Sequence, residues 1–131
     1  MISLMNMKFK IKQLKLFYGD IIEIREAPDG KTVCPVCGIL LGGDPPYRAV
    51  INESNKGTNL PEGAASFDIC PMCKTQYGED DFIEPSEKIS TQQKWDELRR
   101  KWLDEIGWTP EALQQLHDNL DIDIQKPGLS L

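Results

Sequence analysis

Cys34-Pro35-Val36-Cys37-Gly38 and Cys70-Pro71-Met72-Cys73-Lys74 are two copies of a Cys-Pro-x-Cys motif, and they decide what this chain can fold around. Two such turns can bring four sulfurs to the corners of a tetrahedron about 2.3 Å from a zinc ion. When all the ligands are cysteines, the ion has no vacant position for water or substrate, which is typical of a structural site. The sequence therefore predicts one structural Zn2+, held by Cys34, Cys37, Cys70 and Cys73.

The residue after the second cysteine of such a turn often needs a positive φ, which glycine adopts without steric cost. Gly38 meets this need and Lys74 does not. The second turn is therefore either strained by about 1 kcal/mol or shaped differently. The Lys74 ammonium could offset the net negative charge that four thiolates leave on zinc.

The same four cysteines allow other interpretations. Iron in a rubredoxin-like electron-transfer site uses the same ligands, and a disulfide or thioredoxin-like redox pair uses the same spacing. Colour separates iron from zinc, because iron-thiolate protein is red. A redox role accounts poorly for two matched motifs, since one Cys-x-x-Cys suffices for exchange.

Composition favours one domain with a modest core, and it disfavours generic binding of nucleic acids. The 131 residues include 21 acidic and 15 basic ones, for a formal charge of -6. Such a field repels phosphate backbones unless positive charge is concentrated locally. The lysines at 8, 10, 12 and 15 do gather before the first acid, Asp20, and they are interpreted as a soluble strand edge rather than a phosphate-binding strip.

The chain has no apolar run near the ~18 residues that span a bilayer, and lysine and glutamine interrupt the segment through Tyr18. We therefore expect a cytoplasmic protein without membrane association. In a reducing cytoplasm, paired cysteines are more often metal ligands or redox groups than structural disulfides.

Period-two patterns predict strands before and between the motifs. Met7, Phe9 and Ile11 alternate with lysines, and Ile22 and Ile24 alternate with charged residues. These segments form a predicted N-terminal β extension over residues 1–30. Residues 31–84 are predicted to be a four-cysteine zinc ribbon, with a strand at residues 47–51 and an exposed loop at residues 52–65.

The pattern becomes helical after Ser90. Trp95, Leu98, Trp102 and Ile106 form one apolar stripe that Gly107 can end. Thr109-Pro110-Glu111 is a second helix start, followed by leucines at helical spacing. The sequence thus predicts a helical segment over residues 88–120 that packs on the ribbon, and a flexible tail over residues 121–131.

Catalytic candidates are few, so the chain is not expected to be an enzyme. His117 lacks a local nucleophile, and Glu79-Asp80-Asp81 is interpreted as a solvated turn. Trp95 and Trp102 are expected to pack the helix on the zinc module. Trp108, beside the helix-ending glycine, is the better candidate for contact with a protein partner.

The stretch Ser66-Phe67-Asp68-Ile69-Cys70-Pro71-Met72-Cys73, continuing through Tyr77-Gly78 to Asp80-Asp81, resembles the bacterial cysteine-rich CPCC family. The first motif, Trp102 and Gly107-Trp108 resemble it too, so the likeness covers residues 33 to 108. It implies a small zinc-ribbon or rubredoxin-like domain whose ligands match the four cysteines. Some members of that family look like immunity proteins beside bacterial toxins.

These observations together predict an α+β protein: a small rubredoxin-like zinc ribbon with an N-terminal β extension and a C-terminal helical pair. The predicted function is a protein-interaction module, such as an inhibitor or immunity protein that covers a toxin or another bacterial protein with its acidic face. The alternatives are a nucleic-acid or transcription-associated zinc ribbon and a rubredoxin-like iron electron carrier.

Overall fold

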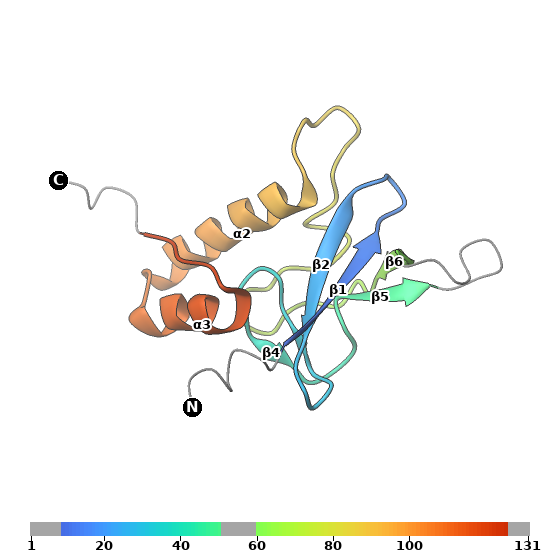
Figure 1. Cartoon of the computed structure of the whole chain (residues 1–131). Helices are drawn as coiled ribbons and strands as arrows, with labels where there is room; N and C mark the ends of the chain where they lie inside the picture. Colours follow the sequence, from blue (N-terminus) through green and yellow to red (C-terminus); the bar gives the residue numbers. More distant parts are fainter. Residues whose placement is uncertain (1–8, 51–59, 126–131) are drawn as a thin grey trace.

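The β-sheet has the N-terminal hairpin at its centre. The computed structural model describes residues 9–50 and 60–125, whose strands form one six-stranded sheet in the order β4-β3-β2-β1-β6-β5 (Figure 1). Its strands are β1 (Lys10–Lys15), β2 (Ile21–Glu26), β3 (Thr32–Val33), β4 (Leu40–Leu41), β5 (Tyr47–Val50) and β6 (Glu62–Ala65). The segment predicted as an extension is therefore the middle of the sheet.

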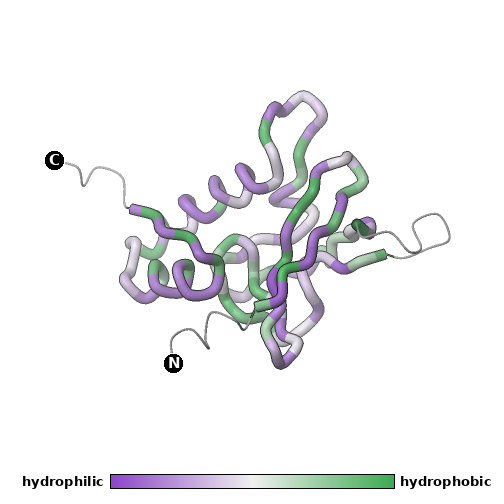
Figure 2. The backbone as a smooth tube through the Cα atoms, in the orientation of Figure 1, coloured by the Kyte–Doolittle hydropathy of each residue, from purple (hydrophilic) through white to green (hydrophobic). Residues whose placement is uncertain are grey.

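The register of the hairpin decides which of its residues are buried. β1 and β2 pair antiparallel with Leu14 opposite Ile22, and both of these side chains are buried. Burial of Ile22 and Ile24 confirms the predicted alternation in β2. A strand forms at β1 as predicted, but the predicted buried face was wrong, because Ile11 lies on the other face and is 49% exposed. Figure 2 shows the alternation of polar and apolar residues along both strands. The predicted partner Met7 lies outside the described residues.

The strand at β5 confirms the prediction as far as Val50, since Ile51 lies outside the described residues. The predicted loop was wrong over Glu62–Ala65, which form β6, pair antiparallel with β5 and join β1 in parallel. Glycine and alanine give a weak strand signal. Gly63 is required there because a Cβ would come 2.9 Å from the Leu14 Cβ.

Helix α2 (Thr91–Ile106) begins and ends where the sequence indicates. Ser90 caps it in a reciprocal pair with Gln93, and Gly107 closes it with φ 86. Trp95 and Trp102 are buried, as predicted, but Ile106 is 39% exposed. The buried stripe instead includes Arg99, which hydrophobic periodicity alone does not reveal.

Helix α3 (Pro110–Leu120) starts at its Thr109 cap and ends at Asp121, which adopts φ 60. The chain beyond it is not free of the fold. Ile122 and Ile124 are partly buried and pack against the core, and the Ile122 N–H donates to the Leu116 carbonyl at 3.2 Å. The predicted flexible tail is therefore wrong for residues 121–125, and residues 126–131 lie outside the described part of the chain.

One core joins the sheet, the cysteine motifs and the helices. It includes Leu14 and Ile22 from the hairpin, Trp95 and Trp102 from α2, and Leu116 from α3. The helices lie to one side of the sheet, and the loop between β3 and β4 lies between the helices and the sheet (Figure 1). Neither described helix is long and apolar enough to cross a membrane.

Asp81 is a buried hydrogen-bond acceptor that fixes the segment after the second motif. Its carboxylate accepts from the Tyr47 hydroxyl at 2.8 Å and from the Trp95 indole at 2.7 Å. It also accepts from the Gly78 N–H at 2.7 Å. The interpretation of this residue as part of a solvated turn was wrong, because the side chain is fully buried.

Candidate metal centre

The four cysteine sulfurs converge on one point. Cys34 Sγ lies 3.8 Å from Cys73 Sγ, and Cys37 Sγ lies 3.7 Å from Cys70 Sγ. All of these sulfurs lie within 4.8 Å of one another. Tetrahedral zinc at about 2.3 Å from each sulfur requires sulfurs about 3.8 Å apart. The observed separations fit such an ion, and they exclude a disulfide in this structure, where the four thiols are free.

The two motifs adopt the same turn despite their different last residues. The Gly38 N–H donates to the Cys34 carbonyl and the Lys74 N–H to the Cys70 carbonyl, both at 2.9 Å. Gly38 has φ 88 and Lys74 has φ 65. The positive φ therefore strains the backbone of Lys74, whereas the same region is unstrained for glycine at position 38. Its ammonium donates to the Pro71 carbonyl at 2.9 Å.

Side chains of the two helices bind the carbonyls of the first motif. The Arg99 guanidinium donates to the carbonyls of Pro35 and Val36, each at 2.8 Å. Gln115 donates to Cys37 O at 2.8 Å, and Asn119 donates to Gly38 O at 2.7 Å. Four successive carbonyls thus receive donors from α2 and α3, which attaches the helical pair to the metal centre.

Arg99 also brings a buried positive charge to this cluster. The residue is 4% exposed and pairs with Asp96 at 3.1 Å. Burial lowers the pKa of its guanidinium, while Asp96 and the nearby Cys34 sulfur act in the opposite direction. Because zinc with four thiolates carries a net negative charge, a cation placed here stabilises the loaded site. The sequence suggested Lys74 for this role and gave no sign of Arg99.

A buried hydroxyl with no partner lies against the sulfurs. Tyr77 is 1% exposed, and its hydroxyl has no hydrogen-bond partner among the described residues. Burial, followed by the neighbouring sulfurs of Cys34 and then of Cys70, raises the pKa of Tyr77. A buried polar group without a partner is costly. A thiolate bound to a metal would give this hydroxyl an acceptor, so the residue fits a loaded site.

Contacts among the four sulfurs shift the pKa values of different thiols in opposite directions. Hydrogen bonds from Cys34 and its neighbours lower the pKa of Cys70 and raise that of Cys37. A metal ion must therefore displace protons from the cluster to bind, which makes its affinity depend on pH.

The second motif is much less covered than the first. Cys34 and Cys37 are buried, whereas Cys73 is partly exposed and Met72 is 39% exposed. A contact from α3 also reaches the second motif, where Gln115 Nε2 lies 3.2 Å from Met72 Sδ. The centre is therefore enclosed on the helix side and open to solvent beside Met72.

The remaining candidates from the sequence lie apart from the centre. Trp108 is 7% exposed and its indole donates to Asp104 at 2.6 Å, so it offers little surface to a partner. His117 is exposed and lies 2.7 Å from Asp123. Lys12 and Lys15 point to opposite faces of β1, and Lys12 pairs with Glu26 at 3.3 Å. Lys8 lies outside the described residues.

Comparisons with known proteins give a short list of relatives. Large ribosomal subunit protein eL34 of Methanococcus maripaludis, from strains C5 and C7, is 41% identical to this chain over 56 residues. That similarity covers 42% of this chain and 63% of each relative, so the chain spans less than two thirds of their length. No family model matches the chain. No solved structure matches it either.

Proposed function

We propose that the chain is a rubredoxin-like zinc ribbon in which Cys34, Cys37, Cys70 and Cys73 hold one structural Zn2+. The observation that carries this proposal is the pair of sulfur separations, 3.7 and 3.8 Å, which suit a tetrahedral ion. Elemental analysis of the purified chain should find one zinc per molecule and a colourless solution. Red protein with iron would identify the rubredoxin-like electron carrier instead, and metal-free protein of native fold would exclude both.

We further propose that this module acts by binding a protein partner rather than by catalysis. A site closed by four cysteines leaves no position for a substrate. The histidine of the chain, His117, is exposed and lies 2.7 Å from Asp123, apart from the cysteine cluster. The formal charge of -6 suits a basic partner surface. The resemblance to the bacterial CPCC family suggests an inhibitor or immunity protein among the possible roles.

A paired capture experiment tests this role. The zinc-loaded chain and its Cys70→Ser variant serve as baits in lysate of the source organism treated with nuclease. We expect a protein that the first bait retains, the second does not, and rising salt releases. Recovery of nothing at low salt would contradict a protein partner, as would equal retention by both baits.

RNA binding is the second candidate, and the likeness to a large ribosomal subunit protein favours it. The basic residues of β1 available for RNA contacts are Lys10, Lys12 and Lys15, with Lys15 on the opposite face of the strand from the other two. Binding of the zinc-loaded chain to ribosomal RNA should then fall steeply as salt increases, because phosphate contacts release counterions. Lys10→Gln and Lys15→Gln should each reduce that slope. Absence of binding at low salt would exclude this candidate.

A further inference from the structure

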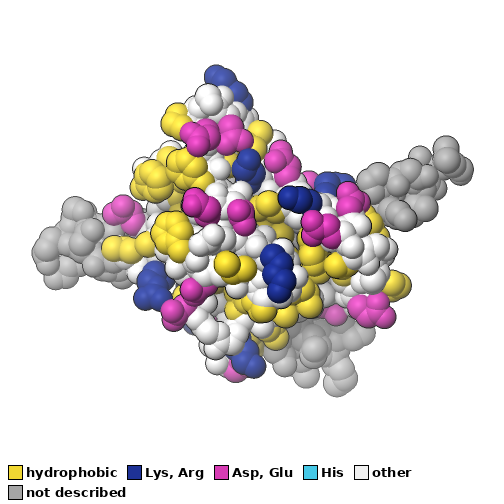
Figure 3. All heavy atoms as spheres, turned by 180° about the vertical axis from the view of Figure 1, so that it is seen from behind, with side chains coloured by type: hydrophobic (Ala, Val, Ile, Leu, Met, Phe, Trp, Pro, Cys, Tyr) yellow, Lys and Arg dark blue, Asp and Glu magenta, His cyan; other side chains and the backbone are white. Residues whose placement is uncertain are grey.

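A cavity of about 320 Å³ lies between the tip of the β1–β2 hairpin, the β5–β6 pair and the segment beside the second cysteine motif. Its volume is near the lower limit of small-molecule sites, which run from about 300 to 1,000 Å³. The cavity is separate from the metal centre, because none of the four cysteines lines it. In the view from behind, hydrophobic side chains gather on the surface with both acidic and basic ones among them (Figure 3).

Aromatic rings form much of the wall. Phe17 stacks on Phe82 with ring centroids 6.2 Å apart, and Tyr18 meets both rings edge to face. The Tyr18 hydroxyl lies 3.1 Å from Thr91 Oγ1, so this polar tip is already engaged. Phe17 remains 76% exposed and Phe67 58% exposed. Exposed rings gathered around a hollow indicate a binding surface.

Phe67 is held in place at a conformational cost. Its backbone has φ 63, a region that bulky side chains rarely adopt. The Gln76 side chain donates to its carbonyl at 3.1 Å, which fixes the peptide. Gly78 makes room for the ring, because a Cβ there would lie 2.8 Å from Phe67 Cε1. Strain of this kind persists where the surrounding structure fixes it, and it gathers at binding sites.

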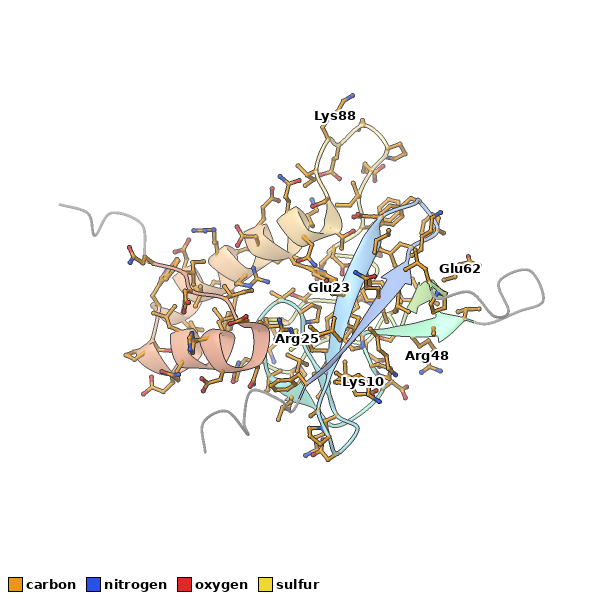
Figure 4. The ribbon with its side chains drawn as sticks, viewed as in Figure 1. Lys10, Glu23, Arg25, Arg48, Glu62 and Lys88 are labelled. Atoms are coloured by element: carbon orange, nitrogen blue, oxygen red, sulfur yellow. The ribbon has the colours of Figure 1, made fainter. Side chains whose placement is uncertain are left out.

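Glu62 supplies the charge of the site. It is the one carboxylate among the described residues that line the cavity. Figure 4 shows it at the start of β6. The cation nearest in register is Lys15, its Cα partner across the β1–β6 pair, yet the ion pairs found among the described residues do not include Glu62. A carboxylate and several aromatic rings that line one cavity are a combination that attracts organic cations.

We propose that this cavity binds an organic cation, with the charged group between the aromatic rings and Glu62. Ring faces attract cations and a carboxylate adds a direct charge. The formal charge of -6 also favours the approach of a cation over that of an anion. A quaternary ammonium compound and the side chain of an arginine share this chemistry. The inference stands apart from the proposed partner binding, since its test uses small molecules alone.

The test compares a cation with its neutral isostere on the zinc-loaded full chain. Choline and 3,3-dimethylbutan-1-ol have nearly the same shape, and only choline is charged. We expect choline to shift the backbone amide resonances of Gly63 and Gly78, both of which line the cavity, and to bind at least about tenfold tighter than the alcohol. Equal binding of the two compounds, or no shift from either, would overturn the proposal.

Two variants locate the site. Glu62→Gln should weaken choline binding about tenfold, and Phe67→Leu should do so to a similar extent by removing a ring. Glu23→Gln is the matched control, because it removes the same charge from an exposed position on β2 outside the cavity (Figure 4). Unchanged zinc content and amide dispersion establish that each variant is folded. Glu62→Gln that binds choline as well as the parent chain does would overturn the proposal.

A third arm distinguishes the two sources of the cation. Blocked arginine, as N-acetyl-arginine amide, is titrated against the same amide resonances. Tighter binding than that of choline indicates the side chain of a protein as the natural occupant, and weaker binding indicates a free quaternary ammonium compound. Either result supports a cation site.

Discussion

The guanidinium of Arg99 donates to the carbonyl oxygen of Val36 at 2.8 Å, across 63 residues of sequence. A second bond from the same group reaches the carbonyl of Pro35, so one side chain holds the backbone between Cys34 and Cys37, two of the four candidate ligands. The position of the first motif therefore depends on α2 as much as on the motif itself.

Replacing Arg99 should weaken the metal centre from outside its ligands. Arg99→Gln removes donors from both carbonyls and a cation from beside Cys34, so we expect zinc affinity to fall about 10- to 100-fold. Competition with a chromophoric chelator measures this. Arg100→Gln is the control, because the neighbouring Arg100 is exposed and bonds Asp96 rather than the carbonyls of the first motif. Equal affinities for the two variants would contradict the role of Arg99.

Tyr77→Phe should alter the metal centre and leave the rest of the fold in place. The hydroxyl has no hydrogen-bond partner among the described residues, so its removal should cost the protein little stability. With metal it can donate to a thiolate, and its loss should shift the sulfur-to-cobalt charge-transfer band of the cobalt-substituted protein. Tyr47→Phe is the comparison: its hydroxyl bonds Asp81, so it should lower stability and leave the band in place. Identical spectra for Tyr77→Phe and the parent chain would refute the contact.

Substitutions at the residues that end the two motifs should change the stability of the protein in opposite directions. Lys74→Gly should stabilise the protein by about 1 kcal/mol, because φ 65 strains lysine and suits glycine. Gly38→Ala should destabilise it by at least as much, since φ 88 disfavours alanine and its Cβ would lie 3.3 Å from the Gln115 carbonyl. Denaturant melts of the zinc-loaded proteins measure both. Loss of stability in Lys74→Gly would show that the bond from its ammonium to Pro71, or its charge, outweighs the strain.

Metal removal should unfold the centre of the molecule. Apparent binding free energies of small structural zinc sites reach about 10 kcal/mol or more at neutral pH. A strong chelator should therefore reduce the melting temperature and the circular dichroism signal. Acid should act in the same direction, because protons compete for the thiolates as pH falls. Melting that is indifferent to a chelator, with metal loss confirmed by elemental analysis, would refute a structural metal.

Asp81→Asn should destabilise the fold by about 2–4 kcal/mol, because Asn cannot offer acceptors in the same way to three buried donors. Those donors are the Tyr47 hydroxyl, the Trp95 indole and the Gly78 N–H. Glu79→Gln, at an exposed neighbour, should change stability by less than about 0.5 kcal/mol. Equal effects of both substitutions in urea melts would contradict the importance of Asp81.

The helices and the ligand set were accessible from sequence because their signals are local. Ser90, Gly107 and Thr109 mark the helix ends through their own backbone preferences, and the spacing of each Cys-Pro-x-Cys motif is four residues long. The contacts of Arg99 are different. Its partners lie more than 60 positions away, and nothing in the helix periodicity distinguishes a buried arginine from an exposed one.

The errors in the sheet have a similar origin. Ile11 fits an alternating pattern, yet which face of the strand is buried depends on the partner strand, and Leu14 lies opposite Ile22. Residues 62–65 carry no strand signal of their own and become β6 through pairing with β5. Asp81 was misjudged because its donors come from β5, from α2 and from a nearby glycine.

The central place of the β1–β2 hairpin has a consequence for anyone who wishes to isolate the cysteine-bearing part. A fragment that begins at residue 31 would deprive β3 of its neighbour on one side and β6 of its parallel neighbour. It would also remove Leu14 and Ile22 from beneath the tryptophans of α2. The smallest part that keeps this core therefore includes the first strands, and a minimal peptide with the two cysteine motifs would lack the hydrophobic residues that pack against them.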